Sequence, residues 1–221
     1  MEHESAYLAQ KFSQIRSFRD WTVGRQSPAR NPQPSDLPTE YLLPDASNLG
    51  LVLGELTFRR QMDRINEQVR KFLPRAEELT TRNVKGKTCL YLRETDNSEP
   101  IPAARLSDGT LRFIALIVAL YSEPTPSLVC IEEPEIGFHP DAMSIVAKLL
   151  MDASEHTQII LTTHSDALLD WLNDREDSVM VFENWGNGTE VERLDAEELS
   201  EWLKTYTLGG LWRSGHLGGK L

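Results

Sequence analysis

The sequence predicts an α/β protein with a mostly parallel sheet, preceded by helices and a β-hairpin. Short runs that are apolar throughout are typical of strands buried on both faces, and they occur at 128–131, 159–162 and 179–182. Segments with helical character accompany them, at 106–122 after a short loop, at 140–153 and at 166–172. Strands that alternate with helices favour parallel pairing, with the helices packed on the sheet. Asn187-Gly188 indicates a turn into a fourth, shorter strand.

The composition fits one sizeable core in a reducing compartment. The chain has 221 residues, a formal net charge of −11 and 40% hydrophobic residues. Its longest apolar run, 113–121, is shorter than the ~20 residues that cross a bilayer, and the segment MEHESAYLAQ lacks the features of a signal peptide. We therefore expect a cytoplasmic protein without a membrane partner, in which Cys89 and Cys130 stay reduced.

The acidic balance argues against a nucleic-acid surface over the whole chain. Five basic residues nevertheless gather on one predicted helix, namely Arg59, Arg60, Arg64, Arg70 and Lys71. A solvated helix face is the interpretation that we favour for them. DNA is therefore expected as an indirect partner at most.

Residues 1–46 are expected to hold a helix and a connector. Apolar residues recur at helical spacing within 5–21, and Ser5 can serve as the N-cap. The stripe consists of Leu8, Phe12, Ile15 and Phe18. Between residues 24 and 44, five prolines remove backbone donors and fix φ, so we expect an extended connector there.

Residues 47–105 are expected to form an insertion of helices and a hairpin, which leaves 106–221 as the main α/β lobe. Ser47 or Asn48 can cap a short helix that runs to about residue 58, and a second amphipathic helix follows at 60–72. Residues 77–94 alternate between apolar and polar character around the turn Lys85-Gly86-Lys87. This pattern predicts a β-hairpin.

Two adjacent carboxylates follow the first buried strand. The segment 128–134 reads LVCIEEP, so Glu132 and Glu133 come at the carboxyl end of the strand, where open α/β sheets bind ligands. In nucleotide hydrolysis one acid there holds Mg²⁺, usually through water, and the next orients or deprotonates the attacking water. We assign Glu132 to the metal and Glu133 to the base. The alternative is an exposed strand end with ordinary acids.

A histidine follows the neighbouring strand. His164 comes two residues after the predicted strand 159–162 and can reach a γ-phosphate and the attacking water if the two strands are adjacent. A surface histidine that caps the next helix is the alternative and is the commoner fate of such a residue. The paired acids one strand away favour the catalytic interpretation.

The segment Leu106-Ser107-Asp108-Gly109-Thr110 opens an apolar helix. The Ser107 hydroxyl, the backbone amides near Gly109 and the positive end of the helix form an anion cradle, and Gly109 lets a phosphate approach the backbone closely. We take Ser107, Asp108, Gly109 and Thr110 as candidate nucleotide-binding residues. A simple N-cap at Ser107 or Asp108 is the alternative, and both can hold at once.

These elements together resemble a known family. LSDGT resembles the ABC signature loop, usually written LSGGQ; residues 127–134 resemble its Walker B strand, and His164 its switch histidine. The wording LSDGTLRF, CIEEPEIGFHP and TQIILTTHSDALLD is similar to the RecF/SMC-like AAA-type ATPases of prokaryotes. The resemblance covers most of 40–219 and implies a P-loop NTPase-like fold of the ABC ATPase type. Asp108 replaces the usual glycine and Thr110 the usual glutamine.

The resemblance implies a set of residue roles with ATP and Mg²⁺. Ser107, Gly109 and Thr110 would bind the γ-phosphate of a nucleotide held by another subunit. Glu132 would act on Mg²⁺, Glu133 on water and His164 on the γ-phosphate. The segment 135–140 would be the D-loop at the dimer interface, which makes Glu135 and His139 second-rank candidates.

The phosphate-binding loop of that family is missing from this sequence. A P-loop reads G-x-x-x-x-G-K-[ST] between a strand and a helix. The nearest approach is Gly86-Lys87-Thr88, but Thr81 stands where the first glycine belongs and the segment reads as a hairpin turn. We therefore expect a P-loop-bearing half to supply the missing lobe, and that half or a homodimer partner to cover the exposed sheet. We expect weak or undetectable ATP binding by the isolated chain.

Three functions compete. The first is an ATP-hydrolysing module that drives conformational change, in DNA repair or in defence against foreign DNA as the resemblance implies. The second is a non-catalytic lobe that pairs with an intact ATPase and regulates it. The third is a metal enzyme that uses Glu132, Glu133, Glu135 and His139 directly. We rank the third last, because it leaves the signature loop without a role.

Overall fold

The computed structural model describes residues 2–19, 24–184, 186 and 188–218. The chain forms two compact units, Met1–Thr162 and Thr163–Leu221. Each is described by itself.

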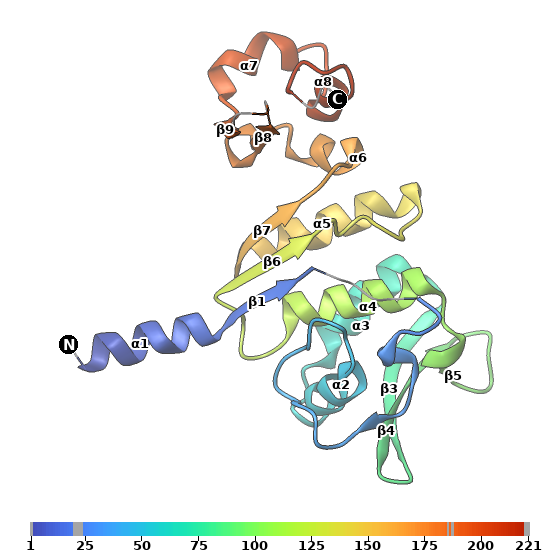
Figure 1. Cartoon of the computed structure of the whole chain (residues 1–221). Coiled ribbons are helices and arrows are strands. Elements are labelled where there is room, and N and C mark those ends of the chain that lie inside the picture. Colours follow the sequence, from blue (N-terminus) through green and yellow to red (C-terminus); the bar gives the residue numbers. More distant parts are fainter. Residues whose placement is uncertain (1, 20–23, 185, 187, 219–221) are drawn as a thin grey trace. The chain divides into compact units, whose positions relative to one another are not determined.

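A parallel sheet organises the first unit. It contains β1 (Ile15–Phe18), β6 (Leu128–Glu132) and β7 (Gln158–Thr162), in the order β1-β6-β7. Both pairs are parallel, and the register of the second pair sets Glu132 beside Thr162. The three strands lie side by side in Figure 1. The predicted α/β class with a parallel sheet is therefore confirmed.

The N-terminal helix is shorter than the predicted span 5–21. Helix α1 (Glu2–Ser13) ends at Ser13, and the next four described residues after Gln14 form β1. Helical spacing of the apolar residues was misleading here, because Phe18 is only 1% exposed through its place in the sheet and not on a helix face. Long-range pairing with β6 overrides the local pattern. On α1 itself, Tyr7, Leu8 and Phe12 are exposed.

The connector packs tightly in places and supplies an unexpected cap. It contains the 3₁₀ turn η1 (Pro28–Arg30) and the short strand β2 (Gln33–Pro34), and it leads to helix α2 (Leu49–Phe58). Asn48 occupies the N-cap position, as predicted, but its side chain ties the preceding loop. The buried Gln33 instead accepts hydrogen bonds from the first amides of α2, at 2.7 and 3.3 Å.

The insertion contains the expected hairpin. Helix α3 (Met62–Phe72) precedes β3 (Ala76–Val84) and β4 (Lys87–Glu94), which pair antiparallel. Strand β2 pairs with β4 on its other side, as does β5 (Ile101–Pro102). Lys85 and Gly86 form the turn with φ of +54° and +78°, values that suit a tight hairpin. The segment Gly86-Lys87-Thr88 is thus a hairpin turn, as predicted, and not a P-loop.

Helix α4 (Asp108–Tyr121) is the centre of the first unit. Every residue from Thr110 to Leu120 is buried, so the helix packs on all sides, as a helix that is apolar all round must. It contacts α2, α3 and α5 (Met143–Ser154), which the turn η3 (Pro140–Ala142) introduces. Phe113 stacks on Phe72 with 4.0 Å between the ring centroids.

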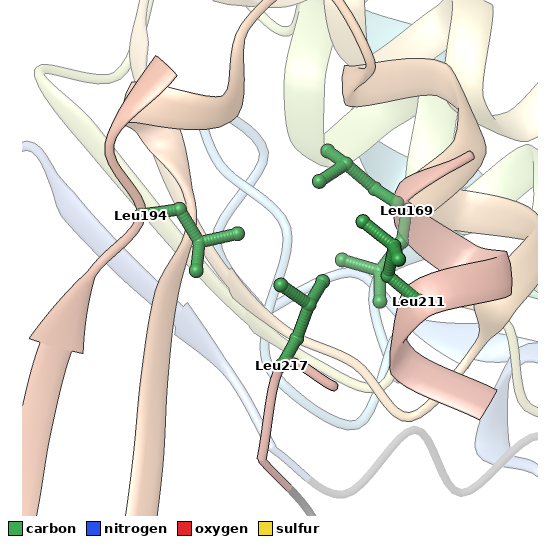
Figure 2. Close-up of a cluster of buried hydrophobic side chains, with 5 residues drawn as sticks. Leu169, Leu194, Leu211 and Leu217 are labelled. Carbon is green, nitrogen blue, oxygen red and sulfur yellow. The ribbon is translucent and has the colours of Figure 1, made fainter. Parts of the chain in front are cut away.

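The second unit has a core of its own. Its elements in chain order are α6 (Asp166–Leu169), η4 (Asp170–Leu172), η5 (Glu176–Ser178), β8 (Met180–Asn184), β9 (Thr189–Arg193), α7 (Ala196–Leu203) and α8 (Leu208–Arg213). The buried cluster consists of five leucines, namely Leu169, Leu194, Leu208, Leu211 and Leu217. Figure 2 labels four of them, and their side chains point toward one another.

One strand prediction in the second unit was wrong. Strand β8 was expected to continue the parallel sheet, but in the described residues it pairs antiparallel with β9 in a separate two-stranded sheet. The two strands follow each other closely in the sequence, and a short connection permits an antiparallel hairpin but no parallel crossover. In the predicted turn, Asn187 lies outside the described residues.

Candidate nucleotide site

The two predicted acids stand at the carboxyl end of β6. Glu132 is the last residue of the strand and lies opposite Thr162 of β7. Its side chain is half exposed and its carboxylate lies 3.4 Å from Nε of Arg19, which follows β1. An exposed ion pair of this kind is weak, so it leaves Glu132 able to exchange partners.

Glu133 occupies an unusual backbone conformation. Its φ is +44°, a region that costs a non-glycine residue about 1–3 kcal/mol. Its N–H donates to the carbonyl of Thr162 at 2.9 Å, which extends the contact between the two strands by one residue. The chain therefore bends sharply at the predicted base and is held there by the neighbouring strand. Strain of this kind gathers at functional sites.

The signature loop begins α4 with a side-chain cap. Ser107 is the N-cap, and its Oγ accepts a hydrogen bond from the Thr110 amide at 3.0 Å. The two hydroxyls of these residues lie 2.8 Å apart. Because Thr110 is only 7% exposed, its side chain supports Ser107 from within the loop. Ser107 and Asp108 are exposed at the positive end of the helix, which suits an anion.

The buried Arg112 connects helix α4 to Glu133, the predicted base. Arg112 is 8% exposed, and its Nη2 donates to the carbonyl of Glu133 at 3.3 Å. Burial lowers the pKa of the Arg112 guanidinium, and the nearby carboxylates of Glu135 and Glu133 partly offset that effect. Sequence reasoning missed this residue. The available signal was that Arg112 is the one charged residue between Gly109 and Tyr121.

The start of α4 also touches the segment that follows the acids. A Cβ at Gly109 would lie 3.3 Å from the carbonyl oxygen of Gly137 and 4.0 Å from the ring of Phe138. Glycine at this position therefore allows the signature loop and the 135–140 segment to approach closely. Within that segment His139 is the N-cap of η3, and its Nδ1 lies 3.3 Å from the Asp141 amide and carboxylate. His139 is largely exposed.

His164 belongs to the second unit and is exposed. It does not cap the following helix, because the side chain of Ser165 is the N-cap and accepts from the Leu168 amide at 3.3 Å. The Thr163 hydroxyl accepts from the Ser165 amide at 2.9 Å. The alternative that His164 caps the next helix is therefore wrong, because Ser165 is the N-cap. The predicted meeting of His164 with Glu133 stays a prediction.

The donor set suits a hydrated Mg²⁺ better than a protein-made metal cage. Within the described ranges there is no group of three or more His, Cys, Asp or Glu side chains placed to hold a metal ion. The direct metal-enzyme interpretation stays ranked last. Mg²⁺ commonly uses one or two carboxylates together with water and substrate phosphates, and the exposed Glu132 at the strand end fits that requirement.

Solved SMC heads share this fold. The Smc head domain of Pyrococcus furiosus, bound to the C-terminal domain of ScpA, matches 71% of this chain and 39% of its own at a TM-score of 0.53 and 16% identity. A second structure comes from work on the ATP-driven dimerization and DNA stimulated activation of SMC ATPases. It matches 69% of this chain and 94% of its own chain, at a TM-score of 0.52 and 14% identity. Identities this low show the fold alone.

Curated relatives are nucleotide-binding and nuclease proteins. The energy-coupling factor transporter ATP-binding protein EcfA2 of Lactobacillus acidophilus is 25% identical over 146 residues, which are 62% of this chain and 48% of that protein. The Old nuclease of Escherichia phage P2 is 28% identical over 129 residues, 52% of this chain and 22% of that protein. The chain thus spans half or less of either relative. Among the described helices, none is both long and apolar enough to cross a membrane.

The family profile described as "AAA domain, putative AbiEii toxin, Type IV TA system" matches residues 2–170. The match includes the signature loop, both acids and His164. The parallel sheet and the likeness to SMC heads agree with it. The chain therefore belongs to this AAA-domain family.

Proposed function

We propose that this chain supplies the signature loop and the catalytic acids of a composite ATP-hydrolysing site, whose triphosphate is held by a P-loop on a partner half. The observation that carries the proposal is the junction at Arg112, where the first turn of the signature helix is tied to the backbone of Glu133. Burying a guanidinium is costly unless it is paired, and Arg112 is buried where it can hold the backbone of Glu133. The given sequence contains no P-loop, so the proposal assigns the triphosphate grip to a P-loop-bearing half.

In this proposal Glu133 is the general base. Its carboxylate takes a proton from the attacking water while the water oxygen bonds to the γ-phosphorus, and the bond from that phosphorus to the β–γ bridging oxygen breaks to release ADP. The left-handed backbone at Glu133 and its bonds to Thr162 and Arg112 hold the residue in place. A fixed base needs little reorganisation at the moment of reaction.

Glu132 would hold Mg²⁺ through water. The ion supplies charge neutralisation at the β- and γ-phosphates. Glu132 would leave its exposed pairing with Arg19 for this role, at small cost. The two adjacent acids thus divide the work, as the sequence predicts.

The signature loop would bind the γ-phosphate of a nucleotide held by the partner. Ser107 and the amide of Gly109 are available at the positive end of α4. Thr110 is buried and acts by orienting the Ser107 hydroxyl. Asp108 carries a negative charge at this end. Glu135 and His139 stay second-rank candidates for contacts across the interface.

His164 would bind the γ-phosphate as a hydrogen-bonding sensor. It follows β7 by two residues, and the carbonyl of Thr162 at the end of β7 accepts from the Glu133 amide. The resemblance of TQIILTTHSDALLD to the family's strand and switch histidine supports the assignment.

A P-loop-bearing half would complete the module, because a homodimer partner has the same sequence and also lacks the P-loop. In the described part of the sheet, β7 is an edge strand, and its Ile160 is 53% exposed. An apolar residue on an edge strand is a typical place for a further strand to pair. We expect the assembly to be cytoplasmic. The likeness to Old nuclease favours a role in DNA repair or in defence against foreign DNA, with DNA as an indirect partner.

The test is ATP hydrolysis by this chain mixed with a P-loop-bearing half of the same ATPase type. Glu133→Gln should lower kcat by about 10²–10⁴-fold, the range for loss of a general base, while the two halves still associate. Glu99→Gln, an exposed acid in a loop, is the matched control and should leave the rate unchanged. Glu132→Gln should raise the Mg²⁺ concentration needed for half-maximal rate.

Two outcomes would contradict the proposal. Tight ATP binding by this chain alone, measured by calorimetry, would show a triphosphate grip that does not need a partner. Association with the partner without hydrolysis, and without any effect of Glu133→Gln, would favour the alternative of a non-catalytic regulatory lobe.

A further inference from the structure

Arg30 has a largely buried side chain that links the connector to the segment before α4. It is the last residue of η1, and its side chain is 10% exposed. Its Nε donates to the carbonyl of Gly24 at 2.9 Å, and its Nη1 donates to the carbonyls of Ala103 at 3.2 Å and Leu106 at 2.6 Å. Its Nη2 pairs with a carboxylate oxygen of Asp108. One guanidinium thus uses its planar fork to fix both ends of the turn that leads into α4.

Asp108 is the carboxylate that Arg30 pairs with. It is the first residue of α4 and stands where the signature loop usually has glycine, between Ser107 and Gly109. Its side chain is about half exposed. A carboxylate is stable at the positive end of a helix, but there it competes with any other anion for the same field. An uncompensated Asp108 would repel a γ-phosphate at the proposed site.

We infer that Arg30 is a positioning residue for nucleotide binding, which neutralises Asp108 and directs its carboxylate away from the anion cradle. This inference rests on the proposed function of the signature loop. The nearly buried guanidinium keeps the pair in one geometry, because four of its contacts are to main-chain or carboxylate oxygens that the fold fixes. Asp108, which departs from the family pattern, and Arg30, which pairs with it, are 78 residues apart in the sequence.

A purely structural role for Arg30 makes a different prediction. If Arg30 only fastens the loop, its loss harms the site whether or not residue 108 carries a charge. If it neutralises Asp108, the harm disappears when the carboxylate is removed as well. The effect of Asp108→Gly in the absence of Arg30 therefore separates the two.

The experiment compares five forms of the chain: wild type, Arg30→Met, Arg30→Lys, Asp108→Gly and the double variant of Arg30→Met with Asp108→Gly. In the completed complex, Arg30→Met should raise the KM for ATP at least tenfold with a smaller change in kcat, because repulsion acts on binding of the anion. Asp108→Gly is the reference form, which has no carboxylate at position 108. The double variant should recover to within threefold of Asp108→Gly. Arg30→Lys, which keeps the charge but loses most of the carbonyl bonds, should lie between wild type and Arg30→Met.

A second readout uses the chain alone. Hydrogen–deuterium exchange of peptides that cover 103–112 should rise at least tenfold in Arg30→Met relative to wild type, while peptides from β3 and β4 stay unchanged. No recovery of KM in the double variant would overturn neutralisation, and unchanged exchange in Arg30→Met would overturn the fixing of the turn by Arg30. Absence of hydrolysis by wild type with its partner would instead count against the proposed function, with the exchange result still deciding the role of Arg30 in the loop.

Discussion

Removal of the Arg112 side-chain charge tests the junction on which the site depends. In Arg112→Met the unbranched apolar stem stays and the guanidinium is lost. The change removes the donor to the carbonyl of Glu133 and the positive charge beside Glu135. Nearly all of the Arg112 side chain is buried, so water cannot readily replace the lost donor.

The expected loss of stability is about 2 kcal/mol. A hydrogen bond to a charged group contributes about 1.5–3 kcal/mol, and breaking a buried charged contact from one side costs about 3–5 kcal/mol. Methionine should offset part of this loss of stability, because its side chain fills the space and the variant has no buried cation to desolvate. The lower part of the combined range is therefore the reasonable figure.

Urea unfolding followed by far-UV circular dichroism measures the change, and hydrogen exchange of peptides from α4 and β6 locates it in the first unit. Arg59→Met is the control, because Arg59 also pairs with a carboxylate, Glu55, but at the surface and four residues away on the same helix. Such a pair contributes less than about 1 kcal/mol. Equal effects of the two substitutions, or a loss below about 0.5 kcal/mol for Arg112→Met, would refute the reasoning.

Three further predictions concern other parts of the chain. Gly209→Ala should destabilise the second unit by about 1–3 kcal/mol, because the added Cβ would lie 2.2 Å from the carbonyl oxygen of Asp166. Gly210→Ala in the same helix is the control and should be nearly neutral, because its Cβ would lie 3.2 Å from the Thr207 hydroxyl. Thermal unfolding measures both changes. Ser107→Ala should cost about 1 kcal/mol through loss of the cap on α4, measured by urea unfolding. Burial raises the pKa of Tyr121 above 10.0, so the folded state holds its proton longer and stability falls as pH rises above about 10; Tyr121→Phe should flatten that decline in denaturation curves taken from pH 9 to 11.

The sequence predicted those elements whose pattern is local. The predicted strands 128–131 and 159–162 match β6 and β7 within one residue. The expected burial on both faces was wrong for β7, which has no buried residue and whose Ile160 is 53% exposed. Strand β1, in contrast, was missed. Its four residues share a helical spacing with the preceding segment, and only pairing with β6, more than a hundred residues away, makes them a strand.

The candidate site divides in the same way. The acids and the signature loop are contiguous motifs, so their positions follow from short stretches of sequence. Arg30 and Arg112 donate to main-chain carbonyls. Every residue has a main-chain carbonyl, so the sequence of the accepting segment does not predict such a contact. A cation within an otherwise apolar helix was the one usable signal, and it pointed to Arg112 alone.

These two arginines explain why the signature loop has a defined position in an acidic protein. The body of α4 is held by apolar packing on every side, but its first turn reaches the surface and carries the exposed Ser107 and Asp108. Arg30 fixes the turn before the helix, and Arg112 fixes its first turn to the backbone at Glu133. Charged contacts to buried oxygens are directional, whereas apolar contacts are not. The loop therefore gains its orientation from the two cations and its stability from the helix behind it, so substitutions of the arginines should disturb nucleotide handling more than they disturb the fold.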